Sequence, residues 1–486
     1  MRRRVLLGAV PAAGLIGAAV VACDAAPAPV REPRGVSLLA PATFGRARRV
    51  AAWNARFFDS TRIQLALAPP YGAHQASGRF ATVGALRELL ASGGTGTTWL
   101  AWTPHEAVPA LAVEGRVRPL EGLTKRDRVN LKVFMPCALQ PAYGLDDQLY
   151  AMPEAVEAGQ LYFNRQHLLD AGIDFRRAGL DFENPNCTWE TLRQTGLDLL
   201  QSRFARERLP WHPGAAGAPL EMWGWMNGGS WISVDGRRAT FMREENIQAL
   251  IWLSKHAQEL GGRERLALPG QISEPASFGN SADEPGRHPL ISGRVSMHFD
   301  STRFVSTLAG TDAAFPIGYV EAPRRWAKAP LVTWTRSSGY ALVRGAPDDG
   351  WQALRFLVSE DAAIVDAATE LDGAPIWTPT PVGPPLLPGP LKRLWFPPYT
   401  GQLAVDKRLA GRYRTEAKLI DEAHDHGLEQ LRHARFRERS PAAEGLWPLL
   451  QEARTQALSG TPPRDALQAA QERAQAILDE AWPGSR

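Results

Sequence analysis

The spacing of apolar residues in the first part of the chain changes between that of strands and that of helices. Short apolar or alternating runs are typical of strands, and apolar residues three to four positions apart are typical of helices. We therefore expect strands over 36–41, 63–68 and 97–102 and helices over 44–61, 80–90 and 104–114. This strand–helix alternation predicts an α/β layer with a parallel sheet.

The rest of the chain predicts a second group of elements. Strands are expected over 295–299 and 317–320, and helices over 246–260, 351–358, 403–424, 446–458 and 463–482. Residues 188–192 are expected to open a further helix. The stretch 379–398 holds eight prolines and predicts an extended connection. The sequence contains no internal repeat.

The N-terminus has the pattern of an export signal. Three arginines precede an apolar run that is short for a membrane span, which disfavours an uncleaved anchor helix. Residues 20–23 (VVAC) resemble the bacterial lipobox, which implies a signal peptide over 1–22 and a lipid on the thiol of Cys23. Residues 23–35 are rich in alanine and proline and would form a lipidated tether. Sec and twin-arginine export both remain open.

Composition excludes several classes of function. A hydrophobic content of 44% with 22% charged residues is typical of a globular protein, and the length is enough for two large lobes. The net charge of +4 is small, and no basic block is interleaved with aromatics, so we expect no nucleic-acid partner. After residue 23, no apolar run is long enough to cross a bilayer.

The remaining two cysteines leave two readings open. In an exported chain Cys137 and Cys187 either form a disulfide or stay buried as free thiols. They do not make a structural zinc site, and His424 and His426, the closely spaced histidines, are expected on an exposed helix face. We therefore expect no metal and no cofactor.

Motifs of activated catalytic groups are absent from the sequence. Neither Gly-x-Ser-x-Gly nor His-Glu-x-x-His occurs. Glu154 and Glu157 are three residues apart, so in a strand they would face opposite sides and could not act as an acid–base pair. The sequence therefore predicts a protein that is not an enzyme.

Several segments, in a shared order, resemble the bacterial extracellular solute-binding proteins that serve sugar ABC importers. They run from about residue 36 to 482, and none is specific by itself. They are 149–158 (LYAMPEAVEA), 161–165 (LYFNR), 168–173 (LLDAGI), 187–192 (CTWETL), 225–230 (WMNGGS), 290–297 (LISGRVSM), 339–343 (GYALV), 351–358 (WQALRFLV) and 463–467 (PRDAL).

This resemblance implies a type II periplasmic-binding-protein fold, an α/β architecture with two lobes, a hinge and an interlobe cleft. Lobe 1 would comprise 36–151 and 324–375, and lobe 2 would comprise 158–318 and 389–486. The chain would cross between them at 152–157, 319–323 and 376–388. Ligand binding would favour the closed form by contacting both lobes.

Candidate ligand-binding residues follow from their placement near this cleft. Trp102 and Trp223 are expected to stack on sugar rings, and Glu154, Asn227 and Asp300 to hydrogen-bond ligand hydroxyls. Arg303 would be a bidentate donor. The opposite wall would be formed by Trp334, Ser338 and Tyr340. Asp300 and Arg303 depart from the family pattern and also suit an acidic or phosphorylated group.

The expected function is capture of a mono- or oligosaccharide and its delivery to the membrane subunits of an ABC importer. The chain would be a monomer, exported and held on the cell membrane by lipid, facing the periplasm or the extracellular space. Alternatives are a binding protein for glycerol phosphate, a polyamine or a peptide, a sensor-kinase partner, and a tethered carbohydrate-active enzyme.

Overall fold

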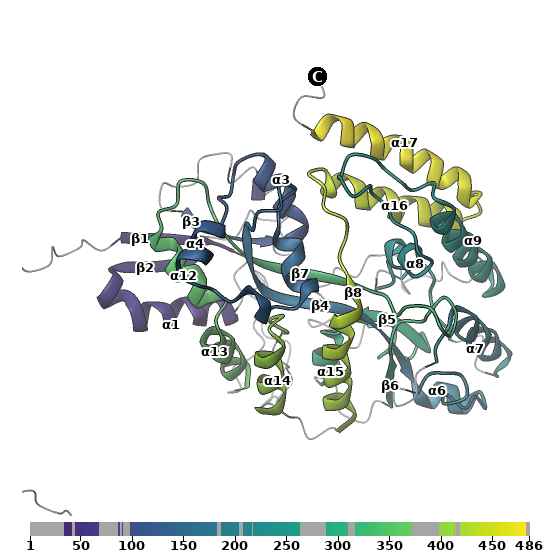
Figure 1. Ribbon diagram of the computed structural model, residues 1–486. Helices are drawn as coiled ribbons and strands as arrows, with labels where there is room; N and C mark the ends of the chain where they lie inside the picture. Colours follow the sequence, from purple (N-terminus) through teal and green to yellow (C-terminus); the bar gives the residue numbers. More distant parts are fainter. Residues whose placement is uncertain are drawn as a thin grey trace, which may run out of the picture.

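Two long antiparallel strands, β4 and β7, form the middle of the sheet (Figure 1). The computed structural model describes residues 34–40, 44–67, 86, 87, 90, 98–181, 186–203, 208–215, 217–262, 288–309, 316–371, 398–412, 414 and 418–482. Within these residues the strand order is β2-β1-β3-β7-β4-β5, with β6 also pairing with β4 and β8 with β7. The strands are β1 (Arg34–Leu39), β2 (Ile63–Leu67), β3 (Thr98–Pro104), β4 (Ala151–Asn164), β5 (Met297–Ser301), β6 (Ile317–Val320), β7 (Thr333–Leu342) and β8 (Ala434–Arg435).

The sheet is mixed: the predicted parallel pairing holds among the first three strands, the short β8 is parallel to β7, and the other strand pairs are antiparallel. β1 is parallel to both β2 and β3, as strand–helix alternation requires. β7 inserts antiparallel between β3 and β4, although it lies more than 200 residues after β3 in the chain. Local periodicity cannot reveal such a long-range pairing.

The helices agree with most of the predicted ranges. They are α1 (Phe44–Thr61), α3 (Val108–Val113), α4 (Glu121–Arg126), α5 (Pro136–Leu139), α6 (Arg165–Asp170), α7 (Trp189–Gln201), α8 (Leu220–Met226), α9 (Glu244–Glu259), α11 (Phe304–Ala309), α12 (Asp349–Leu357), α13 (Glu360–Leu371), α14 (Leu403–Arg412), α15 (Lys418–Gln430), α16 (Ala443–Leu458) and α17 (Pro463–Ala481). The 3-10 turns are η2 (His105–Ala107), η3 (Leu131–Val133), η4 (Gln140–Ala142) and η6 (Leu431–His433).

The single helix predicted over 403–424 is wrong, since α14 and α15 are separate helices. α7 begins as predicted, because the Thr188 side chain accepts a hydrogen bond from the Thr191 amide.

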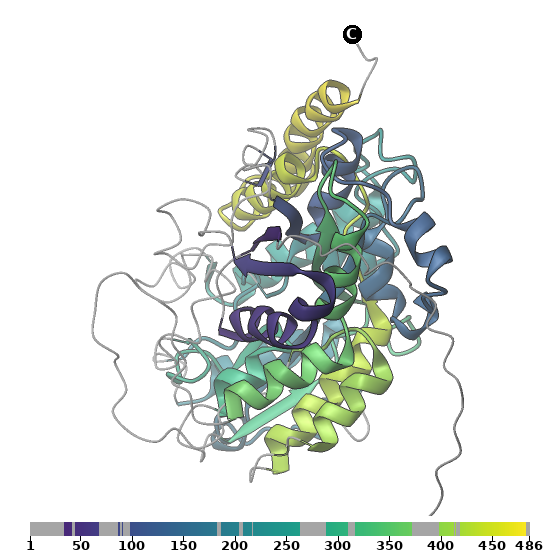
Figure 2. The ribbon, with the colours of Figure 1, turned by 90° about the vertical axis from the view of Figure 1, so that its left-hand side faces the viewer.

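Helices surround the central strands, and two groups of them lie on opposite sides of the strands in Figure 1. α16 and α17 pack side by side above the strands, and α13, α14 and α15 follow one another in a row below them (Figures 1 and 2). β4 and β7 run between these groups and extend from one half of the molecule to the other (Figure 1).

Two large hydrophobic cores lie at opposite ends of this strand pair. One core draws its buried residues from 36–152 and 340–362. The other draws them from 161–334 and 442–478. Since β4 and β7 contribute residues to both cores, the pair is the physical link between the two halves. Two memberships differ from the predicted lobe ranges. Leu331 and Trp334, predicted in lobe 1, belong to the second core. Val405 and Leu409 of α14, predicted in lobe 2, pack against Ala363 and Ala367 of α13.

Several N-terminal and linker predictions lie outside the described residues. These are the signal peptide over 1–22, Cys23, most of the 23–35 tether and the 376–388 crossing. The tether prediction is wrong at its end, because Arg34 and Gly35 already belong to β1. In the described ranges, no helix is both long and apolar enough to span a bilayer.

Cys137 and Cys187 are both buried and free, so the disulfide that the sequence left open is not formed. The two thiols belong to different hydrophobic clusters, Cys187 in the core that contains α7 and Cys137 in a smaller one around α5. Each therefore acts as a small apolar side chain that fills its own core.

Candidate functional site

One face of the β4–β7 pair carries half-buried polar residues and joins the two halves. Glu157 lies directly opposite Arg336, and Ala155 opposite Ser338, in the antiparallel ladder. Directly opposite residues share a face, and side chains along a strand alternate, so Arg336, Ser338 and Tyr340 lie on the same side as Glu157. We call this surface the hinge face. Glu157, Arg336 and Ser338 are only partly buried and can offer both donors and acceptors to a solute, whereas Tyr340 is fully buried.

Around Glu157, the hinge face meets lobe 2. Burial raises the pKa of Glu157, while the nearby guanidinium groups of Arg303 and Arg336 act in the opposite direction. Asp300 also lies close enough to repel the Glu157 carboxylate. The predicted residues Asp300 and Arg303 thus lie near Glu157, and Ser338 shares the face of β7 that carries Arg336.

At the lobe 1 end of the hinge face, Glu154 lies in a buried ionic cluster. The ladder register shifts between Pro153 and Ala155, and this irregularity contains Glu154. Arg46 of α1 donates two hydrogen bonds to the carboxylate, from Nη2 to Oε2 at 2.7 Å and from Nε to Oε1 at 3.1 Å. The Trp102 indole donates to Oε2 at 2.8 Å, and the Tyr340 hydroxyl donates to Oε1.

A second arginine completes this cluster. Arg49 Nη1 lies 3.3 Å from Glu154 Oε1, and its other terminal nitrogen pairs with Asp366 of α13. Burial by itself would raise the pKa of Glu154, but Arg46 and Arg49 outweigh it and hold that pKa at about 2. With five donor contacts, the carboxylate has no acceptor position left for a ligand hydroxyl. In this conformation the carboxylate is engaged within the protein, so the role of Glu154 as a ligand acceptor stays a prediction.

The structure brings Trp102, Glu154 and Tyr340 together, but as a buried cluster. The Trp102 ring is 3% exposed, and the Arg46 guanidinium lies over it at 4.7 Å. One face of the indole is thus already covered by a cation, so the predicted stacking of a sugar on Trp102 finds little open surface. The cluster instead ties α1, β3, β4 and β7 together beside the hinge face.

Two tryptophans predicted to contact ligand belong to the core of the other half. Trp223 is fully buried among Trp189, Trp211 and Trp252, with ring centroids 5.2 to 5.8 Å apart. Trp334 is 3% exposed, and its indole donates to the Gly217 carbonyl at 2.6 Å. Both rings are buried in this structure, so neither presents an open face to a solute, and their predicted roles in stacking on a ligand and lining the cleft gain no support here.

Asn227 is placed away from the hinge face. Its amide nitrogen donates to the Glu245 carbonyl at 2.7 Å, at the start of α9, and its oxygen accepts from Arg325 at 3.1 Å. These contacts link the end of α8 to its neighbours. These contacts give Asn227 a structural role, and its predicted ligand contact stays a prediction.

Near the end of β5, Asp300 is accompanied by two histidines that the sequence analysis did not single out. Asp300 Oδ2 lies 3.1 Å from His288 Nε2 and 3.7 Å from His298 Nε2. Burial would raise the pKa of Asp300, but its hydrogen bond to His288 lowers it overall. These three side chains offer a set of donor atoms within 4.8 Å of one another, where we expected no metal-binding group.

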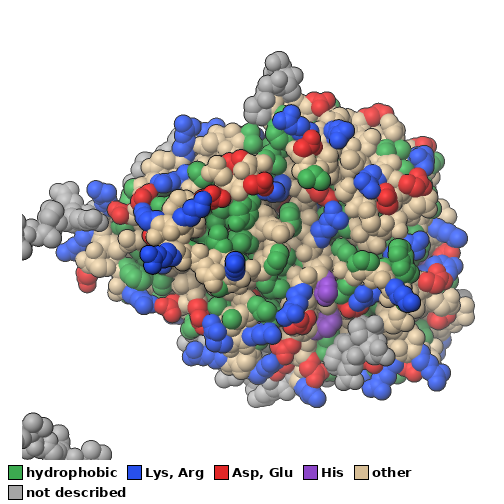
Figure 3. All heavy atoms as spheres, in the orientation of Figure 1, with side chains coloured by type: hydrophobic (Ala, Val, Ile, Leu, Met, Phe, Trp, Pro, Cys, Tyr) green, Lys and Arg blue, Asp and Glu red, His purple; other side chains and the backbone are tan. Residues whose placement is uncertain are grey.

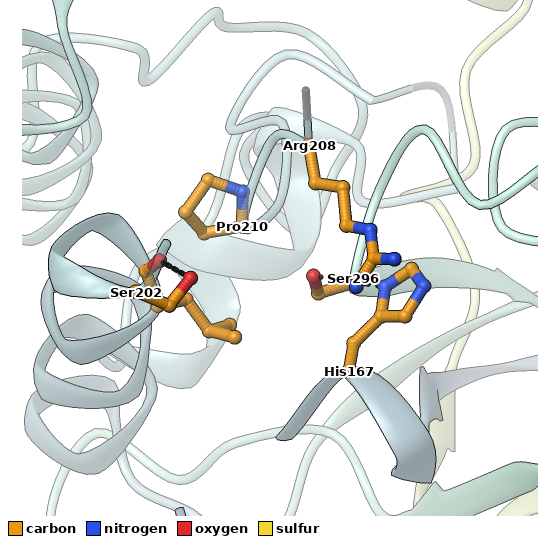
Figure 4. A pocket seen from close by; sticks show the side chains of 6 residues that line it. His167, Ser202, Arg208, Pro210 and Ser296 are labelled. Carbon is orange, nitrogen blue, oxygen red and sulfur yellow. Dashed lines mark hydrogen bonds between the residues drawn. The ribbon is translucent and has the colours of Figure 1, made fainter. Parts of the chain in front are cut away.

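A small cavity lies apart from the hinge face, lined by His167, Leu199, Ser202, Arg208, Pro210 and Ser296 (Figure 4). Its volume of about 10 Å³ suits roughly one water molecule, so it cannot hold a sugar. On the molecular face drawn in Figure 3, acidic and basic side chains are interspersed, and neither sign dominates.

Sequence reasoning missed Arg46, Arg49, Asp366, Glu157's partner Arg336, and the two histidines. Two signals were available: Arg46 and Arg49 are three residues apart on a helix, and His298 and Asp300 are two apart on a strand, so each pair shares a face. No local signal links either pair to its partners, which lie elsewhere in the chain.

Comparisons by sequence and by structure differ in what they find. No protein-family model matches the chain, and no curated protein matches it. Among solved structures, the GacH receptor of Streptomyces glaucescens GLA.O, solved unliganded and with acarbose, is similar with a TM-score of 0.63 at 14% identity, covering 93% of this chain and 100% of that one.

Two further solved structures show similar agreement. An ABC transporter solute-binding protein from Thermotoga lettingae TMO, bound to α-D-tagatose, has a TM-score of 0.62 at 16% identity and covers 92% of this chain and 100% of that one. UgpB from Mycobacterium tuberculosis, in complex with glycerophosphocholine, has a TM-score of 0.63 at 15% identity, and the match covers 93% of this chain and 99% of that one. The chain therefore has the α/β fold of the ABC transporter solute-binding proteins.

Proposed function

We propose that this chain captures a carbohydrate over the hinge face and delivers it to the membrane subunits of an ABC importer. The observation that carries the proposal is the β4–β7 pair, which contributes to both hydrophobic cores and presents Glu157, Arg336 and Ser338 between them. Several proteins of the same fold are described as bound to sugars, including acarbose, mannotriose and α-D-tagatose.

In this proposal the hinge face supplies hydrogen bonds, and bending of the two strands closes the lobes. Glu157 accepts from solute hydroxyls, Arg336 and Arg303 donate, and Ser338 does both. A solute that touches both halves only when they are closed shifts the population toward the closed form. The importer then recognises the closed form, and no bond of the solute is broken.

The proposed location rests on the N-terminal sequence. Export, removal of residues 1–22 and acylation of Cys23 would hold the protein at the membrane surface, facing the periplasm or the extracellular space. Incorporation of labelled palmitate into the wild type and not into a Cys23→Ser chain would support the anchor. Equal labelling of both chains would rule it out.

A melting-temperature screen tests capture and solute class together. A ligand at about 100 times its Kd stabilises a folded protein by about 2.7 kcal/mol, so binding gives a clear shift. We expect a mono- or oligosaccharide to raise the melting temperature of the wild type. Arg303→Ala should reduce that shift, and Arg473→Ala, which loses an exposed ion pair on α17, should keep it.

One observation favours a second candidate solute. UgpB, which has the same fold, was solved with glycerophosphocholine, and Arg303 and Arg336 both lie near Glu157 on the hinge face. Glycerophosphodiesters therefore belong in the screen. A shift with them and none across the sugars would overturn the carbohydrate proposal and retain solute capture, whereas no shift with any solute would overturn capture.

A further inference from the structure

We propose that His288, His298 and Asp300 form a binding site for one divalent transition-metal ion of the zinc class. The three residues supply two imidazole nitrogens and one carboxylate oxygen, a donor set that zinc and its neighbours in the first transition row accept. Solute capture does not require this ion, and the proposal stands independently of it.

The first support is geometric. His298 and Asp300 are two residues apart on β5, so both point to the same face of that strand. His288 approaches from the segment before β5, and its Nε2 is 3.1 Å from Asp300 Oδ2. His298 Nε2 is 3.7 Å from the same oxygen, and the three donor atoms all lie within 4.8 Å. Ligand atoms about 2.0–2.2 Å from a tetrahedral zinc ion are roughly 3.3 Å apart, so small side-chain rotations would close the site.

The second support is an unsatisfied polar atom. His298 is mostly buried, and its Nδ1 has no hydrogen-bond partner among the described residues. Its Nε2 is beyond hydrogen-bond distance from Asp300. A buried imidazole nitrogen without a hydrogen bond is costly, and coordination of a metal ion by this ring would offset that cost.

His288 also contacts Phe304 and Leu290, and a bound ion would have to replace one of these contacts. The ring stacks on Phe304 with centroids 4.0 Å apart, which holds it in place. The Leu290 amide donates to His288 Nδ1 at 3.3 Å, so an ion on Nε2, which favours a proton on Nδ1, competes with that hydrogen bond. The contact is long for a hydrogen bond and is therefore a weak competitor.

The test is metal titration of the full chain without an affinity tag, after treatment with a chelator. Isothermal titration with ZnCl₂ and elemental analysis after gel filtration should give one Zn²⁺ per chain. Because loss of a ligand weakens zinc sites at least as much as the 10- to 100-fold cost of outer-shell changes, Asp300→Asn and His298→Gln should each lower the affinity by more than about tenfold. His433→Gln, which changes an exposed histidine outside the site, should bind as the wild type does.

Circular dichroism and melting curves show whether Asp300→Asn and His298→Gln are folded. If one of them fails to fold, the zinc affinity of the other tests the proposal. Absence of stoichiometric zinc in the wild type would overturn the proposal. So would undiminished binding in folded Asp300→Asn or His298→Gln. The solute screen is run in the presence of a chelator, so its outcome does not depend on whether the chain binds zinc.

Discussion

Glu157 of β4 and Arg336 of β7 lie directly opposite each other in the antiparallel ladder that joins the two halves. Each residue is half-buried, and each influences the pKa of the other. Burial lowers the pKa of Arg336 while Glu157 raises it, so the pair is an electrostatic unit at the centre of the hinge face.

This pairing predicts coupled losses of solute affinity. Glu157→Ala and Arg336→Ala should each weaken binding of the solute found by the screen, and the double variant should lose less than the sum. We expect a coupling free energy of roughly 0.5–3 kcal/mol, as for residues in contact. A double-mutant cycle measured by isothermal titration checks it, and strictly additive losses would contradict the pairing.

Removal of the Glu154 charge should destabilise the fold. Glu154→Gln leaves Arg46 and Arg49 buried beside a neutral group, and breaking a buried ion pair costs about 3–5 kcal/mol. The matched control is Glu452→Gln, which breaks an exposed pair with Arg473 and should cost less than about 1 kcal/mol. Urea unfolding followed by tryptophan fluorescence measures both, and equal costs would contradict the role of the cluster.

The same carboxylate predicts a loss of stability in acid. The pKa of Glu154 is lowered from 4.5 to about 2 in the folded protein, so the native state binds its proton less readily than the unfolded chain. Its stabilising contribution is therefore complete above pH 4.5 and is lost as the pH falls toward 2. This pKa difference corresponds to a contribution of about 3 kcal/mol to the free energy of unfolding. The difference in unfolding free energy between the wild type and Glu154→Gln should shrink over this range, and a constant difference would refute the assignment.

Trp223 should contribute to stability and leave solute binding unchanged. It is fully buried in an aromatic cluster, and truncation of such a side chain costs about 3–5 kcal/mol. Trp223→Ala should thus unfold at lower urea concentration. Its solute affinity, measured where it is folded, should equal that of the wild type. A selective loss of affinity would restore the stacking role that the sequence suggested.

The two core cysteines should be inert in the native protein. Burial raises the pKa of Cys137 and of Cys187 to about 12, so little reactive thiolate forms at neutral pH. In a Cys23→Ser chain we expect no reaction with Ellman's reagent before unfolding and two thiols per chain afterwards. A melting temperature that falls on addition of dithiothreitol would instead indicate a disulfide.

Much of the fold was predictable because its signals are local. The periodicity of residues 36–114 is enough to place β1, α1, β2 and β3, and Ile317–Val320 was predicted as the strand it forms. The order of short segments along the chain also indicated the solute-binding fold, which the similarity to solved structures supports. Glu154 could be placed beside the junction of the lobes by the same reasoning.

The sequence by itself therefore determined the class of fold, the order of its elements and the presence of a polar junction between two halves. Only the tertiary structure decided which polar and aromatic residues stay available to a solute. Trp223 and Trp334 are buried, and Glu154 is occupied by Arg46 and Arg49, because their neighbours come from distant parts of the chain. Helix and strand periodicity reports which residues share a face, but long-range packing sets what covers that face.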